Sequence, residues 1–277
     1  MGPLAGRDAA IRPSREDALS LFETEGLTVR FGGLTALEGV AVRVEEGETV
    51  GLIGPNGSGK TTFFNAVTGL VPATGSVRFG GRDLAGLESH AICRQGIART
   101  FQASRLCVRL SVFDNVLIGM HTQVRTGAFD AVFRRGRVLA EVREALARST
   151  HLLGLFNPDL PRRGFEPVGA LPQIDRRRVE ICRALASRPH LLLLDEPSAG
   201  MSPAETVQLM KDLQVVRDEM SGLSIVIIEH DMFVIEGVSR RVVAFNYGRK
   251  IAEGTFAEVA ADEDVREAYL GREAARA

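Results

Sequence analysis

The pattern of apolar residues changes character along the chain. From Leu21 onward, apolar and β-branched residues alternate with polar ones in LTVRF and again in VAVRVEEGETVGLIG, with Gly-containing turns between them. Such alternation is typical of half-buried strands. The segment TTFFNAVTGL has helical spacing and ends at Gly69. The pattern therefore predicts a β-rich start that leads into a strand, a glycine-rich loop and a helix.

A mainly helical region interrupts this pattern at about residues 84–170. Within it, VFDNVLIGMH and VLAEVREALARSTHLLGLF have helical spacing of their apolar residues. Helices and apolar strands then alternate again, which predicts an α/β fold with helices packed on a largely parallel sheet. The elements expected there are a helix at 174–187, the strand LLLLD, a helix from Pro203 behind a Ser202–Glu205 capping box, the strand SIVIIEH and the hairpin RVVAFNYGRKIAEG.

Composition narrows the class of protein. The chain is 45% hydrophobic and 25% charged with a net charge of −1, which argues against a non-specific nucleic-acid binder. Cys93, Cys107 and Cys182 lack metal-type spacing and predict reduced thiols in a cytosolic protein. No apolar run reaches the roughly 18 residues that a membrane span needs. Residues 1–20 mix Gly, Pro, Arg and Asp without a clear period, and we expect them to form a disordered or loosely docked extension.

The glycine-rich loop carries the first chemical signal. Residues 54–61 read GPNGSGKT and match G-x-x-x-x-G-K-[ST] between a predicted strand and a predicted helix. Glycines let backbone N–H groups converge on phosphate oxygens, and a helix N-terminus adds partial positive charge. We expect Lys60 to pair with the β- and γ-phosphates and Thr61 to place its hydroxyl on Mg²⁺. The predicted nucleotide contacts are Gly54, Pro55, Asn56, Gly57, Ser58, Gly59, Lys60, Thr61 and Thr62.

The strand LLLLD supplies the second signal. Four leucines predict a strand that is buried on both faces, and Asp195 and Glu196 follow at the end where an open α/β sheet exposes ligand-binding groups. Asp195 can hold Mg²⁺ through its carboxylate or a bound water, and Glu196 can orient and deprotonate an attacking water. Together with the glycine-rich loop, this pair predicts a nucleotide-hydrolysing site.

In order and spacing, these motifs resemble an ATP-binding-cassette (ABC) ATPase from about Leu21 to Leu270. The resemblance implies an α/β P-loop NTPase domain of the ABC type at 21–277, with an antiparallel β subdomain and an α-helical subdomain inserted at about 84–170. It implies a glutamine loop at Gln102, a switch histidine at His230 and an adenine-stacking platform at Phe31. The implied catalytic residues are Glu196, His230 and Gln102, the metal ligands are Thr61, Gln102 and Asp195, and the cofactors are ATP and Mg²⁺.

Several longer stretches of the sequence are similar to the LivG-like ATP-binding subunits of branched-chain amino-acid importers. These stretches are FGGLTALEGV, GIARTFQ, LLLLDEPSAG, VIIEHDM and REAYLG. This implies a peripheral ATPase on the cytoplasmic side of the inner membrane. The implied partners are a LivF-like second cassette in a heterodimer, two membrane-spanning permease subunits and, indirectly, a solute-binding protein, with no nucleic acid. The alternatives are a subunit of an importer for urea, amides or another small polar solute, a weakly hydrolysing regulatory cassette, and a cassette ATPase that acts on DNA or ribosomes.

One motif departs from the family pattern. ABC ATPases dimerise so that each ATP lies between one subunit's phosphate loop and the other's signature sequence, which resembles Leu-Pro-Tyr-Gly-Gln-Gln in these importers. This chain has LPQIDR, with Gln173 for Tyr, Ile174 for Gly and Asp175 for Gln. A β-branched residue restricts close backbone approach, and we expect Asp175 to set a negative charge near the triphosphate. The expectation is a heterodimer with one strong and one weakened ATP site, improved by Ile174→Gly with Asp175→Gln.

Overall fold

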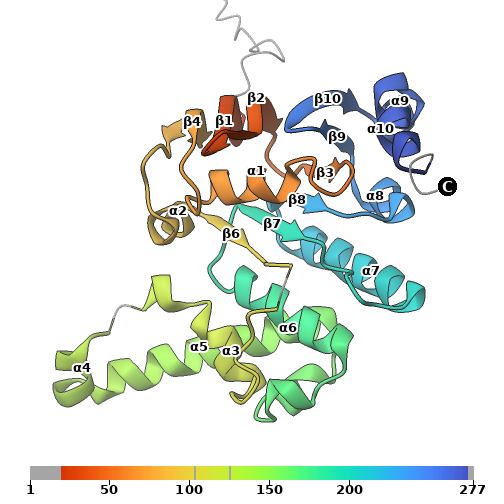
Figure 1. Cartoon of the computed structure of the whole chain (residues 1–277). Coiled ribbons are helices and arrows are strands. Elements are labelled where there is room, and N and C mark those ends of the chain that lie inside the picture. The colour runs from red at the N-terminus through yellow and green to blue at the C-terminus, as the bar shows by residue number, and fades with distance from the viewer. Residues whose placement is uncertain (1–19, 103, 125, 274–277) are drawn as a thin grey trace, which may run out of the picture.

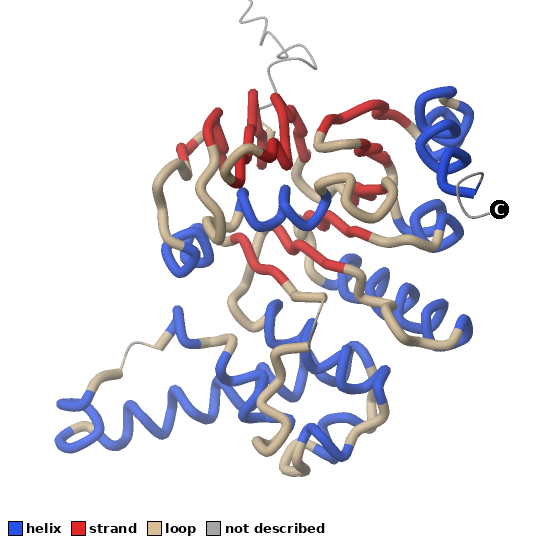
Figure 2. The backbone as a smooth tube through the Cα atoms, viewed as in Figure 1, coloured by secondary structure: helices blue, strands red, loops and turns tan. Residues whose placement is uncertain are grey.

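The computed structural model describes residues 20–273 apart from positions 103 and 125. This part of the chain contains two sheets, helices that pack between and around them, and a separate group of helices (Figure 1, Figure 2). The predicted extension at residues 1–20 lies outside the described residues except for Ser20.

The larger sheet has six strands in the order β10-β9-β3-β8-β7-β6. All are parallel except β10, which runs antiparallel to β9. Because the strands are parallel, the segments that follow β3, β6, β7 and β8 meet at one edge of the sheet. The strands are β3 (Thr49–Ile53), β6 (Ile97–Arg99), β7 (Leu191–Asp195), β8 (Ser224–Ile228), β9 (Arg241–Asn246) and β10 (Arg249–Gly254).

The smaller sheet is antiparallel and has the order β2-β1-β4-β5. Helix α1 (Lys60–Val67) lies between the two sheets (Figure 1). Its Phe63 and Phe64 are buried in a core that includes residues from both sheets. The strands are β1 (Phe22–Phe31), β2 (Leu34–Val44), β4 (Thr74–Phe79) and β5 (Arg82–Asp83).

The helical group lies on the far side of the larger sheet from the smaller sheet (Figure 1). The long helix α5 packs against α3 and α6 through a second core, which includes Leu153 and Phe156. The expected bounds of the helical insert, at about 84–170, stay a prediction. Strand β6 falls within that range but belongs to the larger sheet. The members of the group are α3 (Val112–Ile118), η1 (His121–Gln123), α4 (Ala128–Phe133), α5 (Arg135–Phe156), η2 (Leu160–Arg163), η3 (Val168–Ala170) and α6 (Gln173–Leu185).

The remaining helices surround the larger sheet. Helix α7 begins behind the predicted capping box, in which Ser202 and Glu205 bond each other's backbone N–H. Over the described residues, no helix is long and apolar enough to span a membrane. The predicted α/β class, with an antiparallel sheet and a helical insert, is confirmed. These helices are α2 (Ser89–Gln95), α7 (Pro203–Glu219), α8 (Met232–Val238), α9 (Phe256–Ala261) and α10 (Glu263–Glu273).

Candidate active site

The glycine-rich loop joins β3 to α1 and is tightly curled. Gly54 has φ 143° and Gly59 has φ 107°, a region that side chains rarely allow. A Cβ at Gly54 would lie 2.2 Å from the carbonyl oxygen of Phe245, and one at Gly59 would lie 2.7 Å from Cδ2 of Leu37. Both positions therefore require glycine, for backbone conformation and for space.

Some side chains of the loop are buried and others are exposed to solvent. The Lys60 ammonium is buried and donates to the carbonyl oxygens of Gly54, at 2.6 Å, and Pro55, at 3.1 Å. Thr61, in the first turn of α1, is exposed, as are Asn56 and Gly57. Ser58 is buried and Thr62 is half-buried. The loop thus presents a cation, backbone N–H groups and an exposed hydroxyl at one helix N-terminus, where an anion is favoured.

Asp195, at the end of β7, is 1% exposed. Its Oδ2 accepts a hydrogen bond from Nη2 of Arg99 at 2.7 Å. Its Oδ1 is buried and has no hydrogen-bond partner among the described residues. Burial, together with the neighbouring Glu196 carboxylate, raises the pKa of Asp195 above its ordinary value, although Arg99 and Lys60 oppose the shift. One carboxylate oxygen is thus fixed by Arg99, and the other is buried without a hydrogen-bond partner among the described residues.

The three predicted catalytic side chains come together at the same edge. Nε2 of Gln102, after β6, donates to Oε2 of Glu196 at 2.7 Å, and Nε2 of His230, after β8, lies 2.7 Å from Oε1. Glu196 has φ 48°, a left-handed conformation that is uncommon outside glycine and that Arg188 and Tyr247 share among the described residues. Both oxygens of this carboxylate are therefore held by side chains from neighbouring strand ends. Their catalytic roles stay predictions.

Phe31 ends β1 and is 48% exposed, so its ring is accessible to a ligand. The β1–β2 hairpin lies beside the glycine-rich loop, since a Cβ at Gly59 would lie 2.7 Å from Cδ2 of Leu37 in β2. The N–H of Glu38, the next residue of β2, donates to the carbonyl oxygen of Gly248 at 2.9 Å. Adenine stacking on Phe31 stays a prediction.

The expectation that Asp175 faces a nucleotide is wrong. Its carboxylate is buried, and Oδ1 accepts from Nη1 of Arg178 at 2.8 Å and from Nδ2 of Asn157 at 3.3 Å. The third residue of a helix can point back into the protein, and an internal cation draws this side chain there. Ile174, in contrast, is only half-buried, and the exposed Gln173 donates to the carbonyl of Ala199 at 3.1 Å.

Sequence reasoning did not assign a role to two residues of this site. Arg99 holds Asp195, and Tyr269 of α10 accepts a hydrogen bond from the Gly54 N–H at 2.8 Å. Burial raises the pKa of Tyr269, and the bond from Gly54 acts against the rise. Both residues lie in stretches, GIARTFQ and REAYLG, whose resemblance to the importer subunits gives a role to Gln102 but none to Arg99 or Tyr269. The signal that could have indicated Arg99 is its position as a charged residue at the end of a short apolar strand.

Two family models match the chain. The model described as ABC transporter matches residues 37–199, and the model described as Branched-chain amino acid ATP-binding cassette transporter matches residues 249–275. The second match contains Tyr269.

The relatives and solved structures agree with these matches. The chain is 38% identical over 252 residues to the high-affinity branched-chain amino acid transport ATP-binding protein BraF of Pseudomonas aeruginosa, covering 91% of this chain and 98% of BraF. It is 37% identical to LivG of Escherichia coli, with the same coverage, and 35% identical to the lipopolysaccharide export system ATP-binding protein LptB of that organism, over 92% of this chain and 99% of LptB.

Among solved structures, an ABC-transporter ATP-binding cassette in its ADP conformation has a TM-score of 0.78 and 29% identity, covering 91% of this chain and 99% of its own. The ABC transporter match spans more than half of the 277 residues, and the relatives named above exceed 30% identity across at least 91% of them. The chain therefore belongs to the ABC-transporter family of ATP-binding cassettes and, within it, to the branched-chain amino acid group.

Proposed function

We propose that this chain is the ATP-hydrolysing subunit that energises import of branched-chain amino acids. The observation that carries the proposal is the Glu196 carboxylate, held between Gln102 and His230 beside the glycine-rich loop. A base fixed next to a phosphate-binding loop is what hydrolysis of a nucleoside triphosphate requires.

The glycine-rich loop would bind the triphosphate of ATP. Its backbone N–H groups and the α1 N-terminus provide hydrogen bonds and partial positive charge. The Lys60 ammonium, held at 2.6 Å from the Gly54 carbonyl, is the compact cation for the β- and γ-phosphates. Phe31 would support the adenine by stacking.

The residues present fit Mg²⁺, a hard cation that prefers oxygen ligands. The buried Oδ1 of Asp195 has no hydrogen-bond partner in the described part of the chain, and Thr61 has an exposed hydroxyl at the loop. These oxygens, with the amide oxygen of Gln102, would hold the ion. When bound, Mg²⁺ would neutralise negative charge on the phosphates.

Glu196 would act as the general base. Each carboxylate oxygen has a further lone pair, so a water can be bound without loss of the Gln102 and His230 contacts. As the water oxygen bonds to the γ-phosphorus, the bond from that phosphorus to the bridging oxygen breaks, and ADP and phosphate form. The water proton passes to Glu196.

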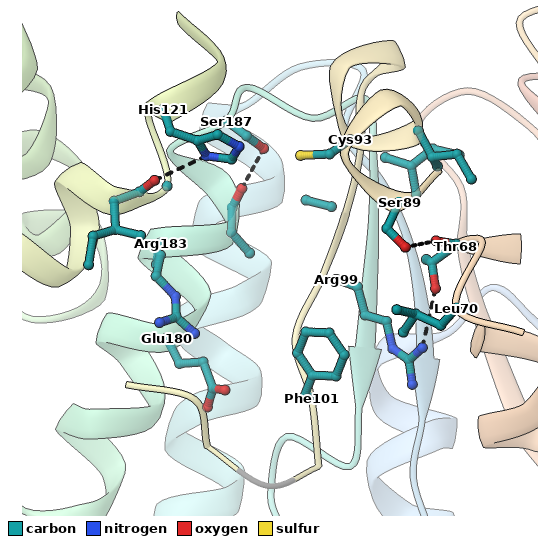
Figure 3. Close-up of a pocket in the computed structure, with 16 residues that line it drawn as sticks. Thr68, Leu70, Ser89, Cys93, Arg99, Phe101, His121, Glu180, Arg183 and Ser187 are labelled. Carbon is teal, nitrogen blue, oxygen red and sulfur yellow. Dashed lines mark hydrogen bonds between the residues drawn. The ribbon is translucent and has the colours of Figure 1, made fainter. Parts of the chain in front are cut away.

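The partners of the proposed machine are a LivF-like second cassette, two permease subunits and a solute-binding protein, with this chain bound at the cytoplasmic face of the inner membrane. A groove of about 260 Å³ between the larger sheet and the helical group would receive a permease segment (Figure 3). Its lining includes Phe101, next to Gln102, so a segment bound there would contact the glutamine loop.

The cassette dimer would have one strong and one weakened ATP site. Ile174 supports the weakened site, since a half-buried side chain takes the place of a glycine at the start of α6. Because Asp175 is paired inside the subunit, backbone approach rather than charge is the physical cause.

The test is reconstitution with the permease subunits and the second cassette in proteoliposomes. We expect leucine uptake that depends on ATP and on the solute-binding protein, and its loss with Glu196→Gln. Vigorous ATP turnover by this chain alone would contradict the asymmetric heterodimer. Coupling to urea or amides instead of leucine would contradict the proposed solute.

A further inference from the structure

Arg99 joins two parts of the candidate active site. It ends β6, its side chain is 5% exposed, and its Nη2 donates to Oδ2 of Asp195 at 2.7 Å. Its Nη1 donates to Oδ1 of Asn65 in α1 at 2.7 Å and lies 3.4 Å from Oγ1 of Thr68. A planar guanidinium can serve two directed partners at once, so Arg99 fixes the end of β7 against the phosphate-loop helix.

The same guanidinium stacks on the residue before Gln102. The Cζ of Arg99 lies 5.0 Å from the ring centroid of Phe101 and 5.3 Å from that of Phe64. Arg105 lies over the Phe101 ring at 3.8 Å. Both arginines are within the distance at which an aromatic face attracts a cation. Arg99 is therefore also connected to the glutamine loop.

Arg99 and Phe101 both line the groove that faces the helical group. Figure 3 shows them on one side of the groove, with Glu180 and Arg183 of α6 on the other. Arg183 Nη1 donates to the carbonyl of Arg105 at 2.7 Å, which connects α6 to the same loop. One buried side chain thus borders the groove and holds the Asp195 carboxylate.

We propose that Arg99 is a positioning residue for Asp195 and thereby for the metal site. By fixing Oδ2, it leaves Oδ1, which has no hydrogen-bond partner among the described residues, as the oxygen that would bind the metal. The inference rests on the proposed role of Asp195 as a metal ligand.

The experiment measures Mn²⁺ binding to the full chain with a non-hydrolysable ATP analogue by electron paramagnetic resonance. Arg99→Met retains the side-chain length but removes the guanidinium group and its two directed hydrogen bonds. We expect Mn²⁺ affinity about tenfold weaker, the usual effect of losing a hydrogen-bond partner of a metal ligand. Arg99→Lys retains the charge but not the two directed bonds, so we expect about threefold weaker binding. Arg105→Met removes the other cation on Phe101 and should leave Mn²⁺ affinity within about twofold.

Two further variants keep the result interpretable. Asn65→Ala removes the α1 partner of Arg99 without touching Asp195, and it should weaken Mn²⁺ binding about threefold even if Arg99→Met does not fold. Unchanged Mn²⁺ affinity in a folded Arg99→Met variant would overturn the inference. Unchanged affinity in both single variants, Asn65→Ala and Arg99→Lys, would overturn it as well. Unchanged affinity in Asp195→Asn would instead contradict the metal role of Asp195 in the proposed function.

Discussion

Replacing Tyr269 by Phe removes a single hydroxyl from the wall of the glycine-rich loop. The Gly54 N–H donates to this hydroxyl at 2.8 Å. Gly54 is buried, and the 2.2 Å separation between its ideal Cβ position and the Phe245 carbonyl oxygen shows how closely the backbones approach. The loop has little room to move toward β9. In the variant, the N–H therefore stays in place without its acceptor.

The expected effect follows from that unpaired donor. A buried donor left without a partner costs about 1–3 kcal/mol. Tyr269 is only half-buried, so water can compensate in part, and we expect a loss of about 1–2 kcal/mol in the free energy of unfolding. Because the loop stays in place, ATP affinity should fall by less than the tenfold that about 1.4 kcal/mol would give.

Urea unfolding followed by circular dichroism and ATP titration by calorimetry measure the two effects in one buffer. The matched control is Tyr247→Phe, because Tyr247 is the other of the two tyrosines, is 88% exposed and lies in the β9–β10 turn. We expect this control to match the wild type in both measurements. If Tyr269→Phe also matches the wild type, the hydroxyl does not anchor the loop and the reasoning is refuted.

Three further predictions concern the base, the signature and an ion pair. Glu196→Gln should retain ATP binding but slow phosphate release at least about 100-fold; undiminished release would exclude Glu196 as the base. With the second cassette, Ile174→Gly should raise turnover up to about tenfold, whereas Asp175→Gln should lower the urea midpoint by breaking a buried pair; the reverse pattern would restore the charge explanation. Burial raises the pKa of Glu48, but hydrogen bonds from Arg241 and from the backbone outweigh it and leave the pKa lowered. The stability advantage over Glu48→Gln should therefore be full at pH 7 and shrink below about pH 4.3, and a constant difference across acid titration would contradict it.

The sequence predicted what depends on local pattern. The glycine-rich loop, the buried strand before Asp195 and the start of α7 at Pro203 follow from residues a few positions apart. The two anchors of the site could not be found this way, because Arg99 and Asp195 are 96 positions apart and Gly54 and Tyr269 are 215 apart. Such contacts depend on the packing of whole elements.

Asp175 shows a different limit of the sequence. Its position in the signature was correctly placed at the N-terminus of α6, but the direction of its side chain was not. That direction is set by Arg178, one turn later, which also pairs with Asp212 of α7 at 2.7 Å. A carboxylate beside a buried cation is stabilised inside the protein, and the distant Asp212 gives no local signal of that cation's position.

The sheet order indicates which of the two contacts to Glu196 can change more easily. Gln102 follows β6, an edge strand of three residues that pairs only with β7, whereas Glu196 and His230 follow interior strands with neighbours on both sides. The glutamine loop is also the segment bonded to α6 through Arg183. A shift of the helical group would therefore displace Gln102 while Glu196 and His230 stay in register. In the proposed function, the Gln102–Glu196 hydrogen bond is then the contact through which a segment bound in the groove would affect Glu196.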